Sequence, residues 1–155
     1  MTPQLTVFEH FPGRRFLGSI PFGEELFAFL GRFCGERTIN AATLCYYGQV
    51  SAYTFGTFDQ QQKVFVTQTQ STAADIVSGS GNIFLNNGKP FVYLTAVLCT
   101  PEGQVLGGRL FPETVSFSVE FTLLEITGDV PVRTYDETTG LFALTTSRCI
   151  AHHNP

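Results

Sequence analysis

Only one stretch of this sequence has the periodicity of a helix, and the other regular stretches have the periodicity of strands. In EELFAFLGRFCGE (residues 24–36) the apolar side chains share one helical stripe, which consists of Leu26, Phe27, Leu30, Phe33 and Cys34. The two glutamates at its start suit the positive end of a helix dipole. The segment predicts a single amphipathic helix whose apolar stripe packs on the core.

The segments around this helix are rich in β-branched and aromatic residues, as strands are. They are RRFLGSI (14–20), NAATLCYYG (40–48), VSAYTFGTF (50–58), KVFVTQTQ (63–70), ADIVSGSGNIFL (74–85), FVYLTAVLC (91–99), QVLGGRL (104–110) and VSFSVEFTLLEI (115–126). Turn-forming residues separate them, Asn-Gly and Pro-Glu-Gly among them. One helix among six to eight mostly antiparallel strands predicts an α+β fold. The 155 residues suit a single domain, 1–155, with one core.

Alternation along two of these segments predicts which side chains face the core. In residues 91–99 one face carries Phe91, Tyr93, Thr95 and Val97, and the other carries Val92, Leu94, Ala96 and Leu98. In residues 115–126 an apolar face carries Val115, Phe117, Val119, Phe121 and Leu123, and a polar face carries Ser116, Ser118, Glu120 and Thr122.

The charge content limits both the surface and the partners of this protein. Charged residues make up 14% of the chain, against roughly a quarter in an ordinary soluble domain. We therefore expect part of the surface to be buried against other copies of the chain, the alternative being a monomer with a neutral Ser/Thr/Gln surface. The net charge is −4 and no cluster of Lys and Arg is present. A freestanding DNA-binding protein is disfavoured, because phosphate neutralisation supplies most of such affinity.

The cysteines and the apolar runs indicate the compartment. Cys34, Cys45, Cys99 and Cys149 show no Cys-x-x-Cys spacing and are predicted to be small buried side chains in a reducing environment. No secretory leader and no apolar run of 18 residues is evident. The sequence predicts a cytoplasmic protein that does not enter a membrane.

A polar constellation is predicted around Arg109. If the hairpin is centred on Pro101-Glu102, facing residue numbers sum to 203 or 204, and a sum of 204 sets Arg109 opposite Thr95, with Tyr93 on the same face. Gly107 and Gly108 would permit a bulge or a close backbone approach. Glu120 is the expected counter-charge.

Three interpretations of this constellation stay open. In the first, Tyr93, Thr95, Arg109 and Glu120 line a pocket, at a subunit boundary, that binds an anion such as a carboxylate or a phosphate. In the second, Arg109 pairs with Glu120 or with a carboxylate of a neighbouring subunit and orients an interface. In the third, Arg109 is a surface residue without a role. None of them assigns a catalytic residue, since no nucleophile with a neighbouring base is evident.

The order of several motifs resembles the plants-and-prokaryotes conserved (PPC) domain. GEELFAFLGRF, ADIVSGSGNI, GKPFVYLTAVL, PEGQVLGGRL, VEFTLLEI and RTYDETTGL carry the resemblance, from about Arg15 to Leu144. It implies a compact α+β domain that assembles as a homotrimer. In plants the domain follows an AT-hook that binds the minor groove, and bacterial single-domain members are described as DNA-binding by analogy. FPGRRF (11–16) lacks the order and basic setting of an AT-hook.

The resemblance also bears on metal binding. Many prokaryotic members of the family carry His-x-His on the GKPF strand and Gly-Gly-His-Leu on its return. This sequence has Tyr93, Thr95 and Arg109 at those places, and a fixed positive charge opposes a divalent cation. We therefore expect no metal and no cofactor. His10, His152 and His153 do not replace the missing imidazoles, because they lie near the two ends of the chain.

Together these features predict a non-catalytic, homotrimeric binding or assembly module. Its expected partners are its own copies and another protein, with weak or no DNA binding and no membrane. The alternative function is a binder of, or an enzyme on, a small anionic molecule held around Arg109.

Overall fold

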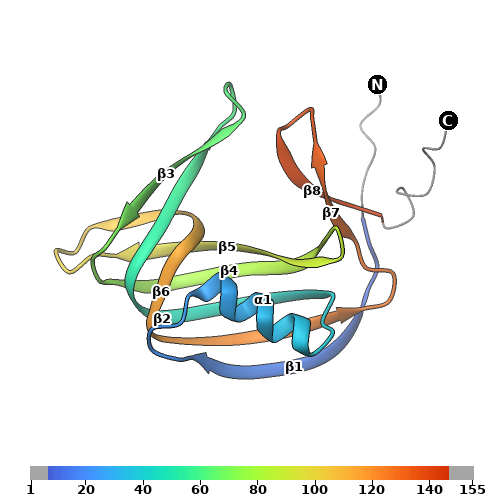
Figure 1. The fold of residues 1–155 in the computed structure, drawn as a ribbon, viewed down its shortest axis with the longest axis horizontal. Coiled ribbons are helices and arrows are strands. Elements are labelled where there is room, and N and C mark those ends of the chain that lie inside the picture. Colours follow the sequence, from blue (N-terminus) through green and yellow to red (C-terminus); the bar gives the residue numbers. More distant parts are fainter. Residues whose placement is uncertain (1–6, 147–155) are drawn as a thin grey trace.

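The structure is a computed structural model that describes residues 7–146 and contains one helix and eight strands (Figure 1). In chain order these are β1 (Phe11–Ile20), α1 (Leu26–Glu36), β2 (Ala41–Asp59), β3 (Val64–Gln70), β4 (Ala74–Asn86), β5 (Lys89–Cys99), β6 (Val105–Thr127), β7 (Val132–Asp136) and β8 (Leu141–Thr145). One helix with a largely antiparallel sheet matches the predicted architecture. No helix among the described residues is long and apolar enough to cross a membrane.

The sheet curls into a closed body. The first half of β2 pairs with β6 along one edge and with β4 along the other, and β5 joins β4 to β6. The four strands β2, β4, β5 and β6 thus form a closed circuit, to which β1 adds by pairing with β6. The enclosed side chains include Leu44, Leu94, Leu110 and Leu123, all of which are buried.

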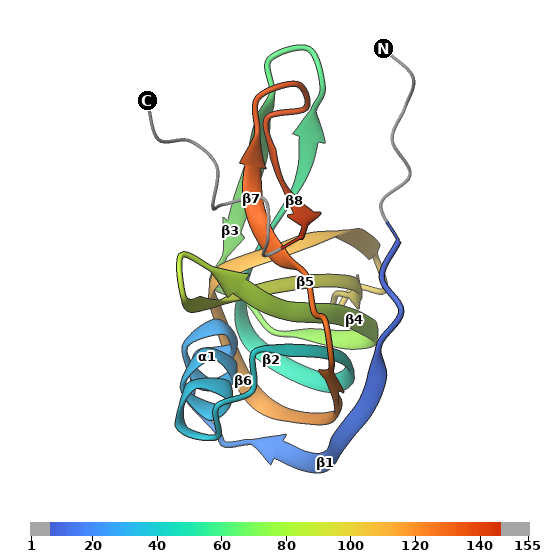
Figure 2. The same cartoon turned by 90° about the vertical axis from the view of Figure 1, so that its right-hand side faces the viewer.

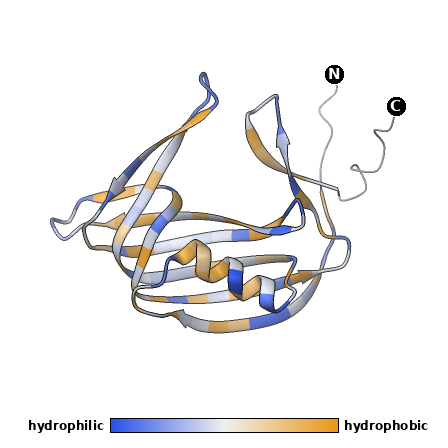
Figure 3. Ribbon diagram, viewed as in Figure 1, coloured by the Kyte–Doolittle hydropathy of each residue, from blue (hydrophilic) through white to orange (hydrophobic). Residues whose placement is uncertain are grey.

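Helix α1 covers one side of this body (Figure 2). Its buried residues Leu26, Leu30 and Cys34 lie on the predicted stripe, and its apolar and polar residues alternate along its length (Figure 3). The Glu25 carboxylate caps the first turn by accepting a hydrogen bond of 2.7 Å from the Ala28 amide. The helix therefore forms as its sequence predicts.

Two hairpin arms leave the body in the same direction. One consists of the second half of β2 with β3, and the other of β7 with β8, and Figure 1 shows both rising on the same side of the body. Their tips touch, since Lys63 Nζ donates a hydrogen bond of 3.0 Å to the carbonyl oxygen of Glu137. The β7–β8 arm joins the body through one parallel bridge, Leu85 to Val132.

Strand β2 corrects the sequence analysis, which expected two strands ending and starting near Gly48. The strand is continuous, and the pairing shifts at Gly48, which has a φ of +133°. Gly48 thus marks a bulge inside a strand, because only glycine adopts this φ without strain.

Strand β6 corrects the predicted faces of residues 115–126. The pairing with β2 runs from Gln49 opposite Ser118 to Val50 opposite Ser116, so Phe117 is an extra residue on its strand. Phe117 is 57% exposed, whereas Ser116 is buried and donates a hydrogen bond of 2.9 Å to the Ile20 carbonyl. Beyond the bulge the prediction holds, and the buried side chains are Val119, Phe121 and Leu123.

This bulge makes a prediction about stability. Phe117→Ser should change the free energy of unfolding by less than about 1 kcal/mol, because an exposed ring loses little on removal. Phe121→Ala should cost about 3 to 5 kcal/mol, because Phe121 is 3% exposed and packs on Phe29 and Phe33. Urea titration of both variants tests this, and equal losses would contradict the assigned bulge.

The cysteines also differ from expectation. Cys34 is buried and Cys99 is partly buried, but Cys45 is exposed, so the prediction of a buried side chain is wrong for Cys45. The reason is the alternation of β2, in which Leu44 and Tyr46 point inward. Cys149 lies outside the described residues.

An ion pair joins β1 to β6 and predicts how stability depends on pH. Arg14 Nε and Nη2 donate to the two carboxylate oxygens of Glu125 at 2.7 and 2.8 Å. The hydrogen bonds from Arg14 lower the pKa of Glu125 to about 2. Because the folded pKa is depressed, this stabilisation is complete above the usual pKa of about 4.3 and is lost as the pH falls toward 2.

We therefore expect Glu125→Gln to flatten the acid side of the stability curve. Between pH 5 and pH 2 the wild type should lose about 1 kcal/mol more than the variant, a value typical of a half-exposed pair. Urea midpoints measured across this range check the prediction. If the wild type and the variant lose the same free energy of unfolding between pH 5 and pH 2, the ion pair contributes nothing to stability.

Candidate functional site

The β5–β6 hairpin has the predicted register. Thr95 lies opposite Arg109 and Leu94 opposite Leu110, so facing residue numbers sum to 204. Leu94 and Leu110 face the core and are fully buried. Alternation then places Tyr93, Thr95 and Arg109 on the outer face of the hairpin, between the two arms.

Only one of the two glycines before Arg109 is required by a close contact. A Cβ at Gly108 would lie 2.6 Å from the Gly56 carbonyl oxygen, whereas a Cβ at Gly107 would meet nothing closer than 3.7 Å. Gly108 therefore lets β6 pass tightly beside β2 next to Arg109. The expected close backbone approach is present at this glycine.

The Arg109 guanidinium is surrounded by aromatic rings. Its central carbon lies 4.2 Å from the ring centroid of Tyr93, 4.7 Å from Phe65, 5.0 Å from Phe111 and 5.9 Å from Phe91. Among the described residues it has no hydrogen-bond or ion-pair partner, and its Nε is buried. Burial lowers the pKa of Arg109, although an arginine side chain stays charged in proteins.

A second arginine, Arg133, reaches the same place from β7. The residue is only 8% exposed, and its Nη1 and Nη2 donate hydrogen bonds of 2.7 Å to the Phe142 carbonyl and to Asn82 Oδ1. Its Nε is buried without a hydrogen-bond partner among the described residues. Burial lowers the pKa of Arg133, and the nearby charge of Arg109 lowers it further.

Sequence reasoning missed Arg133. In the sequence analysis the RTYDETTGL segment served only as a motif of the family resemblance, and Arg133 had no place in the predicted site. Strand β7 crosses to β4 through the Leu85–Val132 bridge and carries Arg133 over Tyr93. The local sequence contains no signal for this, because the partner strand lies far away in the chain.

The two guanidinium groups share Tyr93. Since their central carbons lie 4.2 and 5.0 Å from the same Tyr93 centroid, they are at most 9.2 Å apart. Both line a cavity of about 380 Å³ with Phe91 and Phe142. Arg109 and Tyr93 also line a larger cavity of about 510 Å³ with Phe58, Phe65, Ser80 and Thr95. The two cavities share Tyr93, Arg109 and Leu141 in their linings, and together they are called the groove below.

One carboxylate, that of Asp136, borders the smaller cavity. Its oxygens accept hydrogen bonds from the Thr138 amide at 3.0 Å and the Thr139 hydroxyl at 2.6 Å. These bonds lower the pKa of Asp136, so the carboxylate stays ionised, and they hold it in the β7–β8 turn. With two guanidinium groups and one carboxylate among its lining residues, the groove keeps a net positive charge.

Glu120 does not lie in this groove. It is exposed further along β6 and accepts a hydrogen bond from the Tyr47 hydroxyl, which raises the pKa of Tyr47. Strand β6 changes direction between the two positions, where Glu113 has a φ of +74°. The predicted pairing of Glu120 with Arg109 is therefore wrong, while Tyr93, Thr95 and Arg109 do lie together.

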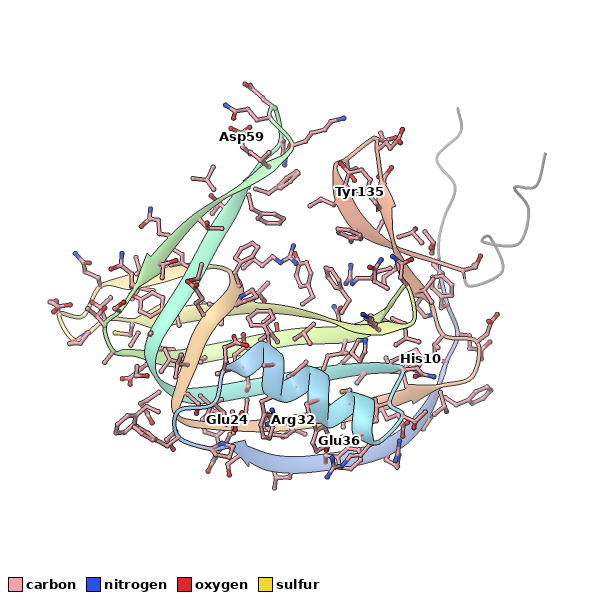
Figure 4. The ribbon with its side chains drawn as sticks, in the orientation of Figure 1. His10, Glu24, Arg32, Glu36, Asp59 and Tyr135 are labelled. Atoms are coloured by element: carbon pink, nitrogen blue, oxygen red, sulfur yellow. The ribbon has the colours of Figure 1, made fainter. Side chains whose placement is uncertain are left out.

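The residues at this place do not fit a metal ion. The ring of Tyr93 and the hydroxyl of Thr95 lie beside the fixed positive charge of Arg109, and this charge repels a divalent cation. Within residues 7–146 no three His, Cys, Asp or Glu side chains lie close enough to hold a metal. His10 is exposed just before β1 (Figure 4), and His152 and His153 lie outside the described residues.

Solved structures share this fold. A metal-containing protein from Archaeoglobus fulgidus is 33% identical, with a TM-score of 0.86 over 91% of this chain and 99% of that one. A plant- and prokaryote-conserved protein from Pyrococcus horikoshii is 28% identical, with a TM-score of 0.86 over 91% and 97%. A "putative DNA-binding protein" from Bacteroides thetaiotaomicron is 20% identical, with a TM-score of 0.78 over 90% and 99%, which shows the fold alone.

The family follows from a sequence match as well as from the fold. No curated protein matches this chain. The model of the Plants and Prokaryotes Conserved (PCC) domain matches residues 8–127, which include Tyr93, Thr95 and Arg109 but end before β7 and Arg133. The chain belongs to the Plants and Prokaryotes Conserved domain family.

Proposed function

We propose that this protein is a non-catalytic binding module that holds a small anionic molecule between Arg109 and Arg133. The observation that carries the proposal is the state of Arg109, a half-buried cation without a hydrogen-bond or ion-pair partner among the described residues. A charge removed from water is costly unless an opposite charge compensates it. An anion from solution would supply that compensation.

The donors available in the groove suit a carboxylate or a phosphate. A guanidinium presents its N–H groups in a planar fork that matches two oxygens of such a group. Within residues 7–146 the Nε of Arg109 and the Nε of Arg133 have no hydrogen-bond partner, so both are available to an anion. Charge-assisted hydrogen bonds of this kind are about twice as strong as neutral ones.

The hydroxyl groups of the groove favour binding over catalysis. Ser80 and Thr95 lie 3.4 Å apart, and Thr95 donates to the Ser80 carbonyl at 3.2 Å. Among the described residues neither bonds to a histidine or a carboxylate, so neither has the base that an activated nucleophile needs.

The module is proposed to work as a homotrimer. The low charge content supports self-association, as do large apolar side chains that are exposed in the single chain, among them Val77, Val97 and Val105. The net charge of −4 supports weak and sequence-indifferent DNA binding at most. Two solved structures of this fold are named "putative DNA-binding protein", and that activity is the second candidate function for this chain.

The anion proposal is tested by titrating acetate and phosphate into the protein at constant ionic strength, with heat as the readout. The wild type should bind at least one of the two, and Arg109→Met should bind it at least 10-fold more weakly, since a charged hydrogen bond is worth about 1.5 to 3 kcal/mol. Arg32→Met is the matched control, because Arg32 lies on α1 beside Glu24, away from the groove (Figure 4).

The same variants separate binding from assembly. Sedimentation should give three chains for the wild type, Arg109→Met and Arg32→Met alike. If Arg109→Met dissociates the trimer and leaves anion binding unchanged, Arg109 serves an interface and the proposal fails. A sub-micromolar specific complex with DNA at moderate salt would instead favour the second candidate function.

A further inference from the structure

We infer that the anion held at Arg109 is an aromatic carboxylate whose ring lies between the two arms. This inference rests on the proposed function and names the class of its ligand. It is carried by the shape and lining of the groove, which has an aromatic cluster on each wall and one free cationic group at its base.

The first wall belongs to the β2–β3 arm and the adjoining part of β6. Phe65 lies 4.9 Å from Phe58 and 5.1 Å from Phe111, measured between ring centroids. Phe58 and Phe65 both line the larger cavity. These three rings are called the first cluster below.

The second wall belongs to β5 and the β7–β8 arm. Phe142 lies 5.2 Å from Phe91 and 5.6 Å from Tyr135, again between centroids. Phe91 and Phe142 line the smaller cavity. These three rings are called the second cluster, and Figure 4 shows Tyr135 on the arm opposite the one that ends at Asp59.

Arg109 stands between the two clusters. Its guanidinium contacts Phe65 and Phe111 of the first and Phe91 of the second. A carboxylate bound to its free N–H groups would therefore direct the attached body along a groove with rings on either side. Aromatic rings stacked or set edge to face gain about 0.5 to 1.5 kcal/mol beyond the burial of their area.

The groove is too large for a bare anion. Cavities of about 510 and 380 Å³ would leave the aromatic walls in water if only an inorganic ion were bound. Arg109 is the one charged residue among those that line the larger cavity. The ligand body is therefore uncharged and apolar, with the hydroxyls of Ser80 and Thr95 available to polar substituents.

The described donors also favour a carboxylate over a nucleotide. Phosphate groups are commonly held by several free backbone amides at the start of a helix. The glycine-rich segment SGSGN instead lies within β4, where a Cβ at Gly79 would lie 2.5 Å from the Tyr46 ring. Its glycines serve close packing and leave no cradle for a phosphate chain.

The experiment is a set of heat titrations at constant ionic strength with benzoate, cyclohexanecarboxylate and inorganic phosphate. We expect benzoate to bind about 5-fold more tightly than cyclohexanecarboxylate, which has the same charge and a similar volume, and more tightly than phosphate. Phe65→Leu should reduce the benzoate preference to less than about 2-fold. Phe22→Leu, at a ring 74% exposed on another face, should leave it unchanged.

Each outcome separates this inference from the proposed function. If cyclohexanecarboxylate or phosphate binds as tightly as benzoate, and Arg109→Met weakens both, the anion site stands and the aromatic class is overturned. A benzoate preference that survives in Phe65→Leu would also overturn the place assigned to the ring. If no compound shows binding that depends on Arg109, the proposed function and this inference fail together.

Discussion

Replacing Gly48 by alanine is expected to lower the free energy of unfolding by about 3 kcal/mol or more, which corresponds to a fall in Tm of about 10 °C for a chain of this length. A Cβ at this position would lie 2.1 Å from the Ser118 carbonyl oxygen, and the φ of +133° is strained for any residue with a Cβ. The backbone of β2 cannot easily shift to relieve this clash, because β2 pairs here with β4 on one edge and with β6 on the other.

Gly31→Ala is the matched control for this substitution. Gly31 lies in α1, where an added Cβ meets nothing within 4 Å, so alanine should stabilise the protein by up to about 1 kcal/mol through helix propensity. If the bulge is correctly placed, thermal unfolding should give a lower Tm for Gly48→Ala and a higher Tm for Gly31→Ala than for the wild type. A Gly48→Ala protein that melts within 2 °C of the wild type would contradict it.

Arg133→Met should release the β7–β8 arm from the body and leave the body folded. The substitution removes the hydrogen bond that joins Arg133 to Asn82 of β4, worth about 1.5 to 3 kcal/mol as a bond to a charged group, and also the bond to the Phe142 carbonyl within the arm. The remaining ties are the bridge between Leu85 and Val132, the hydrogen bond from Asn86 to the Arg133 carbonyl, the packing of Phe142 on Phe91 and the Lys63 contact at the tip. They are few for an arm of two short strands.

Hydrogen exchange measures this release. Amide protection over residues 132–145 should fall about 10- to 100-fold in Arg133→Met, while β2, β4 and β5 keep theirs. Arg32→Met, which loses an exposed ion pair on α1, should leave the arm unchanged. A uniform loss of protection across the chain would show that Arg133 stabilises the whole fold and does not tether the arm alone.

The parts of the fold that sequence reasoning predicted are those with local signals. The helix has its apolar stripe within 13 residues, and the β5–β6 hairpin has its register fixed by a short turn at Pro101 and Gly103. This local pairing was enough to bring Tyr93, Thr95 and Arg109 together. The family resemblance also rested on local motifs, and the family match confirms it.

The parts that sequence reasoning missed depend on bulges, strand bends and long-range pairings, which a local sequence pattern does not encode. A bulge shifts every side chain beyond it by one face, and so Phe117 is exposed although its spacing fits the core. The change of direction near Glu113 separates Glu120 from Arg109. Arg133 reaches the groove through a parallel pairing between distant segments, which no hairpin rule predicts.

These differences change the chemistry assigned to the site. With Glu120 as a partner, Arg109 would be one half of an ion pair in an interface. With Arg133 in its place, the groove holds two guanidinium groups, and each has a buried Nε that lacks a hydrogen-bond partner among the described residues. An arrangement of two cations beside one tyrosine ring favours an anion from solution as the missing component.

The most direct test of this anion site is NMR spectroscopy of the arginine Nε–H groups while benzoate, and separately phosphate, is added. The chain has seven arginines, so the Nε–H spectrum is sparse, and Arg109→Met and Arg133→Met assign the two signals of interest. The account predicts that both signals shift together with one dissociation constant, while the Arg32 signal stays in place. If neither signal moves at saturating concentrations of both anions, Arg109 and Arg133 do not form an anion-binding site.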